Sequence, residues 1–321
     1  MADTMTGTPL LWGGFAVFIL AMMALDLGIL NRKAHEPGMK EAVGWSIAWL
    51  LLAVVFGAGV WGFEGADKGL QFYTGYLVEE ALSVDNLFVF LAVFSYFAVP
   101  RELRHSVLFW GVLGAVILRA MFIFVGGALL HAFDWLIYVF GAFLVLTAVK
   151  LARSHGEEVH PEHNPVLKIC RKLFRSTKAY HGGHFFWRGD DGILRATPLF
   201  FVLVVVEFTD VMFAVDSVPA VFAVTTDTFI VYTSNIFAIL GLRSLFFVLS
   251  GVLKRFTLLH YGLAGVLGFV GIKMLVSPVL ETRFGREIPV LLSLGVIAGL
   301  LALSIGASLW ATRRAARKAR R

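Results

Sequence analysis

The fold of this chain is decided by the stretch EEALSVDN, Glu79–Asn86, which places three carboxylates among residues otherwise apolar enough to lie in a lipid bilayer. The pattern returns as DVMFAVDS, Asp210–Ser217: an acid, five residues, an acid after a valine, and a small polar side chain. Acidic side chains are costly inside a membrane and usually serve a function there. Two copies, each within an apolar stretch, therefore indicate a duplicated ion site.

The composition of the whole chain is that of a membrane protein. Of its 321 residues, 58% are apolar and 16% are charged, and the mean hydropathy is +0.80, whereas a soluble domain is about half apolar and a quarter charged. We therefore expect an all-α polytopic protein. Stretches long enough to cross a hydrocarbon core of about 30 Å predict nine transmembrane helices, at residues 9–31, 40–62, 70–97, 104–127, 134–152, 196–225, 228–252, 260–276 and 288–311.

Basic residues are unevenly distributed between the segments that connect these spans. With the N-terminus outside, 22 of the 28 Lys and Arg residues fall in cytoplasmic segments, and only three fall in outer loops. This bias predicts an outer N-terminus and a cytoplasmic C-terminus. The basic tail, residues 313–321, is expected to contact anionic lipids, and nucleic acid is a distant second interpretation of the net charge of +6.

The similarity between the two octapeptides extends along the chain. Leu118–Phe122 (LRAMF) matches Leu242–Phe246 (LRSLF), and Lys150 near the end of the fifth span matches Lys273 in the eighth. Each repeat then contains three helices, spans 3–5 and spans 6–8. Because three crossings are an odd number, the second copy is inverted in the membrane, which is the architecture of many secondary transporters.

The sequence is expected to divide into five segments. The long loop between the repeats holds five of the nine histidines. We interpret it as a solvated loop, because no helical spacing aligns these histidines. The alternative is that the loop binds a divalent metal weakly. The single cysteine, Cys170, excludes an internal disulfide and argues against redox chemistry.

The five expected segments are residues 1–69 (two helices), 70–152 (first repeat), 153–195 (cytoplasmic loop), 196–276 (inverted second repeat) and 277–321 (last helix and basic tail).

Acidic side chains outnumber basic side chains within the predicted spans. The acids are Asp26, Glu79, Glu80, Asp85, Glu207, Asp210 and Asp216, and the bases are Arg119, Arg243 and Lys273. Four carboxylates remain after every pairing, and protons or cations must neutralise them. Such oxygen donors are the ligands that Mg²⁺, Ca²⁺ and Mn²⁺ prefer, and the lack of Cys and His at this depth argues against zinc and copper. The alternative is that the acids only join helices through pairs with the arginines.

The spacing within the octapeptides limits how one site can form. Acids six residues apart point about 120° away from each other on a regular helix. Either the helices break, near Gly75 and Pro219, or the site combines acids of both repeats. Glu80 is the weakest candidate, because Val211 stands at its counterpart. We predict metal ligation by Glu79, Asp85, Asn86, Glu207, Asp210, Asp216 and Ser217, with supporting ion pairs from Arg119, Arg243 and Asp26.

Three stretches resemble the TerC family of integral membrane proteins, most closely its Alx-like branch: Gly75–Asn86, Glu207–Ala220 and Phe237–Arg243. The resemblance covers nearly the whole chain. It implies a member of the LysE-type transporter group, located in the cytoplasmic (inner) membrane and exporting manganese(II). It also implies that Glu79, Asp85, Asp210 and Asp216 occupy the acidic positions of the family.

The expected function is therefore secondary transport rather than enzyme catalysis. Manganese(II), as the transported ion, would leave the cytoplasm in exchange for protons on the same carboxylates, without any permanently bound cofactor. The chain holds no nucleotide-binding motif, so ATP hydrolysis would not drive the step. The alternatives are export of calcium or of a small amino compound, or a membrane scaffold that senses metal or pH through the histidine-rich loop. The sequence leaves the oligomeric state open.

Overall fold

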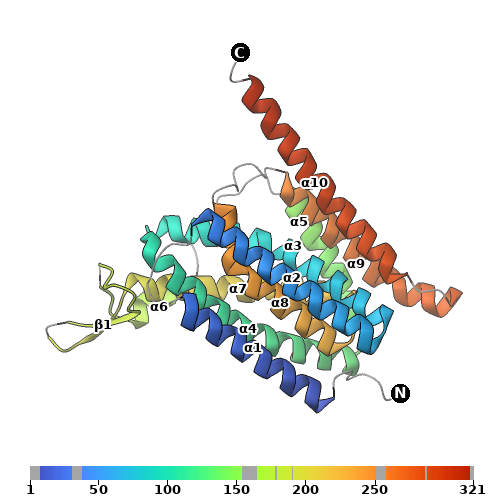
Figure 1. Cartoon of the computed structure of the whole chain (residues 1–321), viewed down its shortest axis with the longest axis horizontal. Helices are drawn as coiled ribbons and strands as arrows, with labels where there is room; N and C mark the ends of the chain where they lie inside the picture. The colour runs from blue at the N-terminus through green and yellow to red at the C-terminus, as the bar shows by residue number, and fades with distance from the viewer. Residues whose placement is uncertain are drawn as a thin grey trace.

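A computed structural model of the chain describes residues 8–30, 38–153, 165–177, 179–189, 191–250, 258–285 and 288–318. These residues form helices and one short hairpin (Figure 1). The elements are α1 Pro9–Leu30, α2 Met39–Glu64, α3 Ala66–Tyr96, α4 Arg101–Ala132, α5 Leu136–Arg153, α6 Pro165–Leu173, β1 Phe186–Arg188, β2 Leu194–Ala196, α7 Pro198–Phe222, α8 Thr228–Ser250, α9 Leu259–Phe284 and α10 Val290–Lys318.

Seven of the nine predicted spans correspond to helices that are long and apolar enough to cross a membrane: α2, α4, α5, α7, α8, α9 and α10. The other two predicted spans coincide with α1 and α3. Within the described part of α1, only Pro9–Met22 is counted as an apolar stretch. Helix α3 spans 31 residues but includes the acidic octapeptide, which lowers its hydropathy. The all-helical, multi-pass membrane character is confirmed, and the count of nine spans stays a prediction.

The helices of the two predicted repeats pack against one another in crossed pairs. Helix α3 contacts α7 and α8, α4 contacts the same two helices, and α5 packs along α9. Helix α2 covers α3 and α8, while α10 lies along α9 and projects away from the others at its C-terminal end (Figure 1). Helices α5 and α9 approach closely at two glycines: a Cβ atom on Gly271 would lie 2.9 Å from the carbonyl oxygen of Gly141.

Helix α1 is attached through aromatic side chains. Phe15 is buried and packs against Phe56 of α2 and Phe229 of α8, with ring centroids 5.6 Å and 6.0 Å away. Trp12 packs against Phe124 of α4 at 5.4 Å. Aromatic rings bury a large apolar area, so a few such contacts hold α1 beside the helices that carry the site.

A break in the helices at the acidic motifs, one of the two alternatives for forming the site, is wrong. Helix α3 runs without interruption through its octapeptide, and α7 continues through Pro219 to Phe222. Pro219 lies inside α7, three residues before its end, and the helix continues past it although its missing N–H leaves the carbonyl of Val215 without a helical hydrogen bond. Gly75 serves packing instead: a Cβ atom there would lie 2.9 Å from the hydroxyl of Ser234 on α8.

The segment between the repeats is more structured than a plain loop where it is described. It contains α6 and a hairpin in which β1 and β2 pair antiparallel, with Trp187 opposite Arg195. The rings of Phe174, Phe186 and Phe200 form a chain of contacts that joins this segment to the start of α7. His181 stacks on Trp187 at 4.5 Å. Three further histidines, His155, His160 and His163, lie outside the described residues.

Candidate ion-binding site

The centre of the bundle holds a buried group of charged and polar side chains around Arg119 of α4. The Arg119 side chain is 1% exposed and pairs with the carboxylate of Glu79 on α3, which is completely buried. The same guanidinium nitrogen donates to Ser217 Oγ at 2.9 Å and to Asn235 Oδ1 at 2.8 Å. A second nitrogen lies 3.6 Å from Asp210 Oδ1. We call Glu79, Arg119, Asp210, Ser217 and Asn235 the arginine network.

The arginine network has a fixed geometry because a guanidinium presents its donors in a rigid plane. It combines one acid from each predicted repeat, Glu79 and Asp210, so this acid pair is shared between the repeats. Asp210 also lines a narrow crevice together with Arg243 of α8. Removing one member of a buried ion pair leaves a charge without compensation, which is strongly destabilising. These contacts make the network a stabilising element between α3, α4, α7 and α8.

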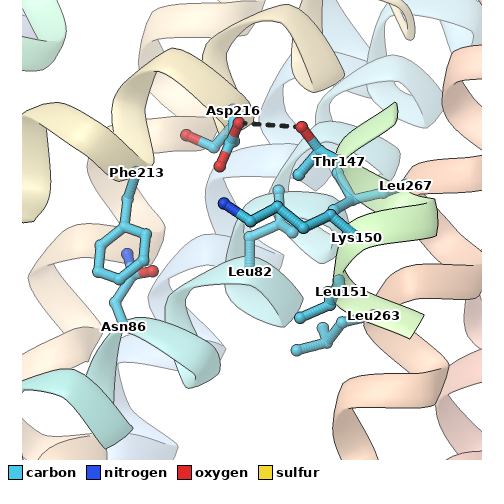
Figure 2. Close-up of a pocket in the computed structure, with 10 residues that line it drawn as sticks. Leu82, Asn86, Thr147, Lys150, Leu151, Phe213, Asp216, Leu263 and Leu267 are labelled. Carbon is cyan, nitrogen blue, oxygen red and sulfur yellow. Dashed lines mark hydrogen bonds between the residues drawn. The ribbon is translucent and has the colours of Figure 1, made fainter. Parts of the chain in front are cut away.

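A cavity of about 210 Å³ lies beside the network and contains Asp216, the second acid of the α7 octapeptide. Thr147 Oγ1 of α5 donates to Asp216 Oδ1 across 3.4 Å. Figure 2 shows the amine of Lys150 directed from α5 toward Asp216, and Asn86 of α3 beside the ring of Phe213. We call this the Asp216 cavity; its lining residues are Leu82, Asn86, Thr147, Lys150, Leu151, Phe213, Asp216, Ser217, Leu263 and Leu267.

Ser217 connects the two groups. Its hydroxyl accepts from Arg119, and the residue also lines the Asp216 cavity. Asp216 is half-buried, whereas Glu79 and Asp210 are buried. Adjacent residues of one helix thus contribute to a buried ion-pair network and to a partly open, mostly apolar cavity that holds a carboxylate.

The other predicted site residues lie outside these two groups or are not described. Glu207 of α7 lies against Gly114 of α4, and one of its carboxylate oxygens is buried without a hydrogen-bond partner among the described residues. Glu80 lies beside Tyr76 on its own helix. The side chains of Asp85 and Asp26 fall outside the described residues. Among the side chains that are described, no three of His, Cys, Asp and Glu form a group that could hold a metal ion.

Three residues of the site were missed by the sequence interpretation: Thr147, Lys150 and Asn235. Lys150 lies within the fifth predicted span, but the count of bases inside the spans omits it because it lies close to the end of that span. Thr147 precedes it by three residues, so the two share one helix face. Asn235 is a polar residue within an apolar helix, a signal that could have been used.

The family of the chain follows from comparison with known proteins. The model of the family described as "Integral membrane protein TerC family" matches residues 64–316. This chain belongs to the TerC family. The match includes both octapeptides, Arg119 and Arg243, and hence all of the described residues of the arginine network and the Asp216 cavity.

Relatives of this TerC protein match over nearly their whole length. An uncharacterized membrane protein of Myxococcus xanthus, STKORF319, is 52% identical over 309 residues, 96% of this chain and 95% of the relative. The Alx protein of Escherichia coli (strain K12) is 49% identical over 317 residues, 96% and 97% of the two chains, and carries the provisional name of membrane-bound redox modulator. The Alx protein of Salmonella typhi is 49% identical over 323 residues, 98% of each chain. No solved structure matches.

Proposed function

We propose that this TerC protein is a secondary transporter, not an enzyme, that exports Mn²⁺ from the cytoplasm in exchange for protons. The observation that carries the proposal is the Asp216 cavity, because it joins a carboxylate to neutral oxygen donors in one partly open space. A carboxylate with amide and hydroxyl oxygens is a suitable ligand set for a hard divalent cation. The cavity provides these groups from Asp216, Asn86 and Ser217.

The same cavity contains a positive charge that the transported ion must overcome. Lys150 lies on the side of the cavity opposite Asn86, and its charge acts on the carboxylate of Asp216. A divalent cation that binds Asp216 therefore competes with an ammonium group held on the protein. Asp85 directly precedes Asn86 on α3 and is proposed as a further ligand, in agreement with the family resemblance.

Glu79 and Asp210 are proposed to keep a structural role while the ion binds elsewhere. Both already interact with Arg119, so their attraction for a metal ion is largely cancelled. Ser217, which contacts Arg119 and lines the cavity, provides a physical connection by which ion binding changes the network. Glu207 is proposed as an accessory carboxylate one helical turn before Asp210.

Alternating access through two inverted repeats is the proposed mechanism. The packing supports this mechanism. If the two repeats are equivalent, α3 corresponds to α7, α4 to α8 and α5 to α9. The contact between α3 and α8 then corresponds to the contact between α7 and α4, and α5 and α9 contact each other; both kinds of contact are present. An inverted repeat requires this behaviour. With α1, α2 and α10, the two repeats account for nine crossings.

The cavity is proposed to open toward the cytoplasm. It is bounded by Lys150 and Leu151 in the last turn of α5 and by Leu263 near the start of α9. These helix ends adjoin residues 154–164 and 251–257, which the charge bias places inside the cell. To test the orientation, Lys172→Cys in a Cys170→Ser background should resist a membrane-impermeant thiol reagent in intact cells and react in inverted vesicles. Labelling in intact cells would reverse the topology.

Transport is tested directly by Mn²⁺ uptake into inverted membrane vesicles. Because metal ligands bind in their ionised form, an arriving cation displaces protons, and an acidic vesicle lumen should drive uptake against the Mn²⁺ gradient. An ionophore that collapses the proton gradient should stop this uptake. Glu102→Gln, an exposed acid at the start of α4, is the matched control and should transport normally. Uptake that ignores both pH and ionophore would exclude proton exchange.

The alternatives give different results in the same vesicles. Calcium uses the same oxygen ligands, so Ca²⁺ that abolishes Mn²⁺ uptake at an equal concentration, and is itself taken up, would make calcium the preferred ion. A scaffold or sensor gives no uptake of either ion. The redox role named for the Alx relatives would require different chemistry here, since the chain offers no second cysteine for thiol–disulfide exchange.

A further inference from the structure

A second cavity, of about 340 Å³, lies at the opposite ends of the repeat helices. It is formed between the start of α3, the connection from α7 to α8, the second half of α9 and the start of α10. The charge bias places these segments on the outer side of the membrane. Its charged and polar lining consists of Lys68, Gln71, Thr225, Thr226, Asp227, Lys273, Ser277 and Glu281.

On one side of this outer cavity, the charged and polar side chains already have partners within the protein. Lys68 of α3 pairs with Asp227, and Asp227 Oδ1 accepts the backbone N–H of Phe229 at 3.0 Å, which caps the start of α8. Thr225 donates to the side-chain oxygen of Gln71 at 2.6 Å. These groups have partners within the protein and do not require a ligand.

The opposite side, on α9, lacks partners. Lys273 is 8% exposed, yet among the described residues none forms a hydrogen bond or an ion pair with it. Ser277 lies one turn further along the same face, and its hydroxyl is buried without a hydrogen-bond partner in the described part of the chain. Glu281 lies a further turn away and is exposed, and no ion pair joins it to Lys273.

A buried ammonium without a counter-charge is costly, and native proteins pair such groups. A hydroxyl one turn away adds a second donor to the same cavity. We propose that the Lys273 side of the outer cavity binds a compact oxyanion, with one oxygen accepting from the Lys273 ammonium and another from the Ser277 hydroxyl. The source is either a free anion such as inorganic phosphate or the phosphate group of an anionic phospholipid.

The proposal does not depend on manganese transport, because it uses neither the Asp216 cavity nor the arginine network. It assigns a chemical role to a lysine that the repeat pattern pairs with Lys150 but that faces a different cavity. The two repeat-related lysines then act on opposite partners: Lys150 on a carboxylate of the protein, and Lys273 on an anion from outside.

The test uses the purified full-length protein in detergent. Thermal unfolding is followed while phosphate replaces chloride at constant ionic strength, and a ligand that binds only the folded state raises the melting temperature. In a second arm, native mass spectrometry compares retention of phosphatidylglycerol with retention of phosphatidylcholine. The variants are Lys273→Met and Ser277→Ala, and Lys172→Met on the exposed surface of α6 is the matched control.

We expect the wild type and Lys172→Met to respond to one of the two ligands, and Lys273→Met to bind it about tenfold more weakly because a charge-assisted hydrogen bond is lost. Ser277→Ala should weaken binding less. A response to phosphate alone identifies a soluble anion, and selective retention of phosphatidylglycerol identifies a lipid headgroup. The proposal is overturned if the wild type responds to neither ligand, or if Lys273→Met responds as the wild type does.

Discussion

The arginine network and the Asp216 cavity are neighbours on the same helices but differ in how their carboxylates are compensated. In the network, Glu79 and Asp210 are buried and held by Arg119. In the cavity, Asp216 is half-buried; among the described residues it accepts one long hydrogen bond, 3.4 Å from Thr147, and an ammonium is directed at it. Under the proposed function, one acid of the second motif serves stability and the other serves ion binding.

The largest loss of stability is expected when Arg119, the cation shared by the two acids of the network, is removed. Arg119→Met leaves Glu79 and Asp210 buried without their partner, and breaking a buried pair costs about 3–5 kcal/mol. We expect loss of folded protein from the membrane and a large fall in melting temperature. The measurement is thermal unfolding of the purified variant beside the wild type.

A compensated variant serves as the control for Arg119→Met. In the triple variant Arg119→Met, Glu79→Gln and Asp210→Asn, the buried charges are removed together, and replacing a whole buried ion group is far less harmful than removing one partner. Much of the lost stability should return. If the single and triple variants are equally unstable, packing rather than charge explains the network.

A smaller effect is expected when the cation of the cavity is removed. Lys150→Met takes away a positive charge that competes with the transported ion, so Mn²⁺ should bind roughly fivefold more tightly, a modest change because exposed charges are screened by solvent. Lys150→Arg should bind as the wild type does. The measurement is equilibrium Mn²⁺ binding by calorimetry, with Lys172→Met as control; unchanged or weaker binding would show that Lys150 does not oppose the ion.

The smallest effect is expected at Glu80. This acid lies beside Tyr76 and belongs to neither group of side chains. Glu80→Gln should therefore change Mn²⁺ uptake by less than about twofold, since its charge acts on the ion only from a distance. Uptake by inverted vesicles, normalised to the amount of protein, measures this; a loss as great as that of a cavity variant would extend the site to Glu80.

Much of the fold could be predicted from the sequence because apolar length is a strong signal. Each predicted span coincides with a helix, and Glu79 and Asp210, one acid from each octapeptide, both contact Arg119. The alternative of a helix break is wrong, because Gly75 allows close packing with Ser234 and α7 continues through Pro219 to Phe222.

The division of the acids into two groups could not be predicted. It depends on where α4 and α5 approach α7, since Arg119 and Thr147 are distant in sequence from the acids that they contact. A count of acids against bases also missed Lys150, because the end of a span is uncertain by a few residues. The ligand set predicted from the sequence includes residues of both the network and the cavity, and it stays a prediction.

The central claim is that Asp216 carries ion transport while the arginine network carries stability. Its most direct test is Mn²⁺ uptake by Asp216→Asn in inverted vesicles, measured together with the melting temperature of the purified variant. Loss of a charged oxygen ligand should reduce uptake by at least about tenfold, while the melting temperature stays within about 2 °C of the wild type, because no buried ion pair is broken. Normal uptake, or instability like that of Arg119→Met, would contradict the account.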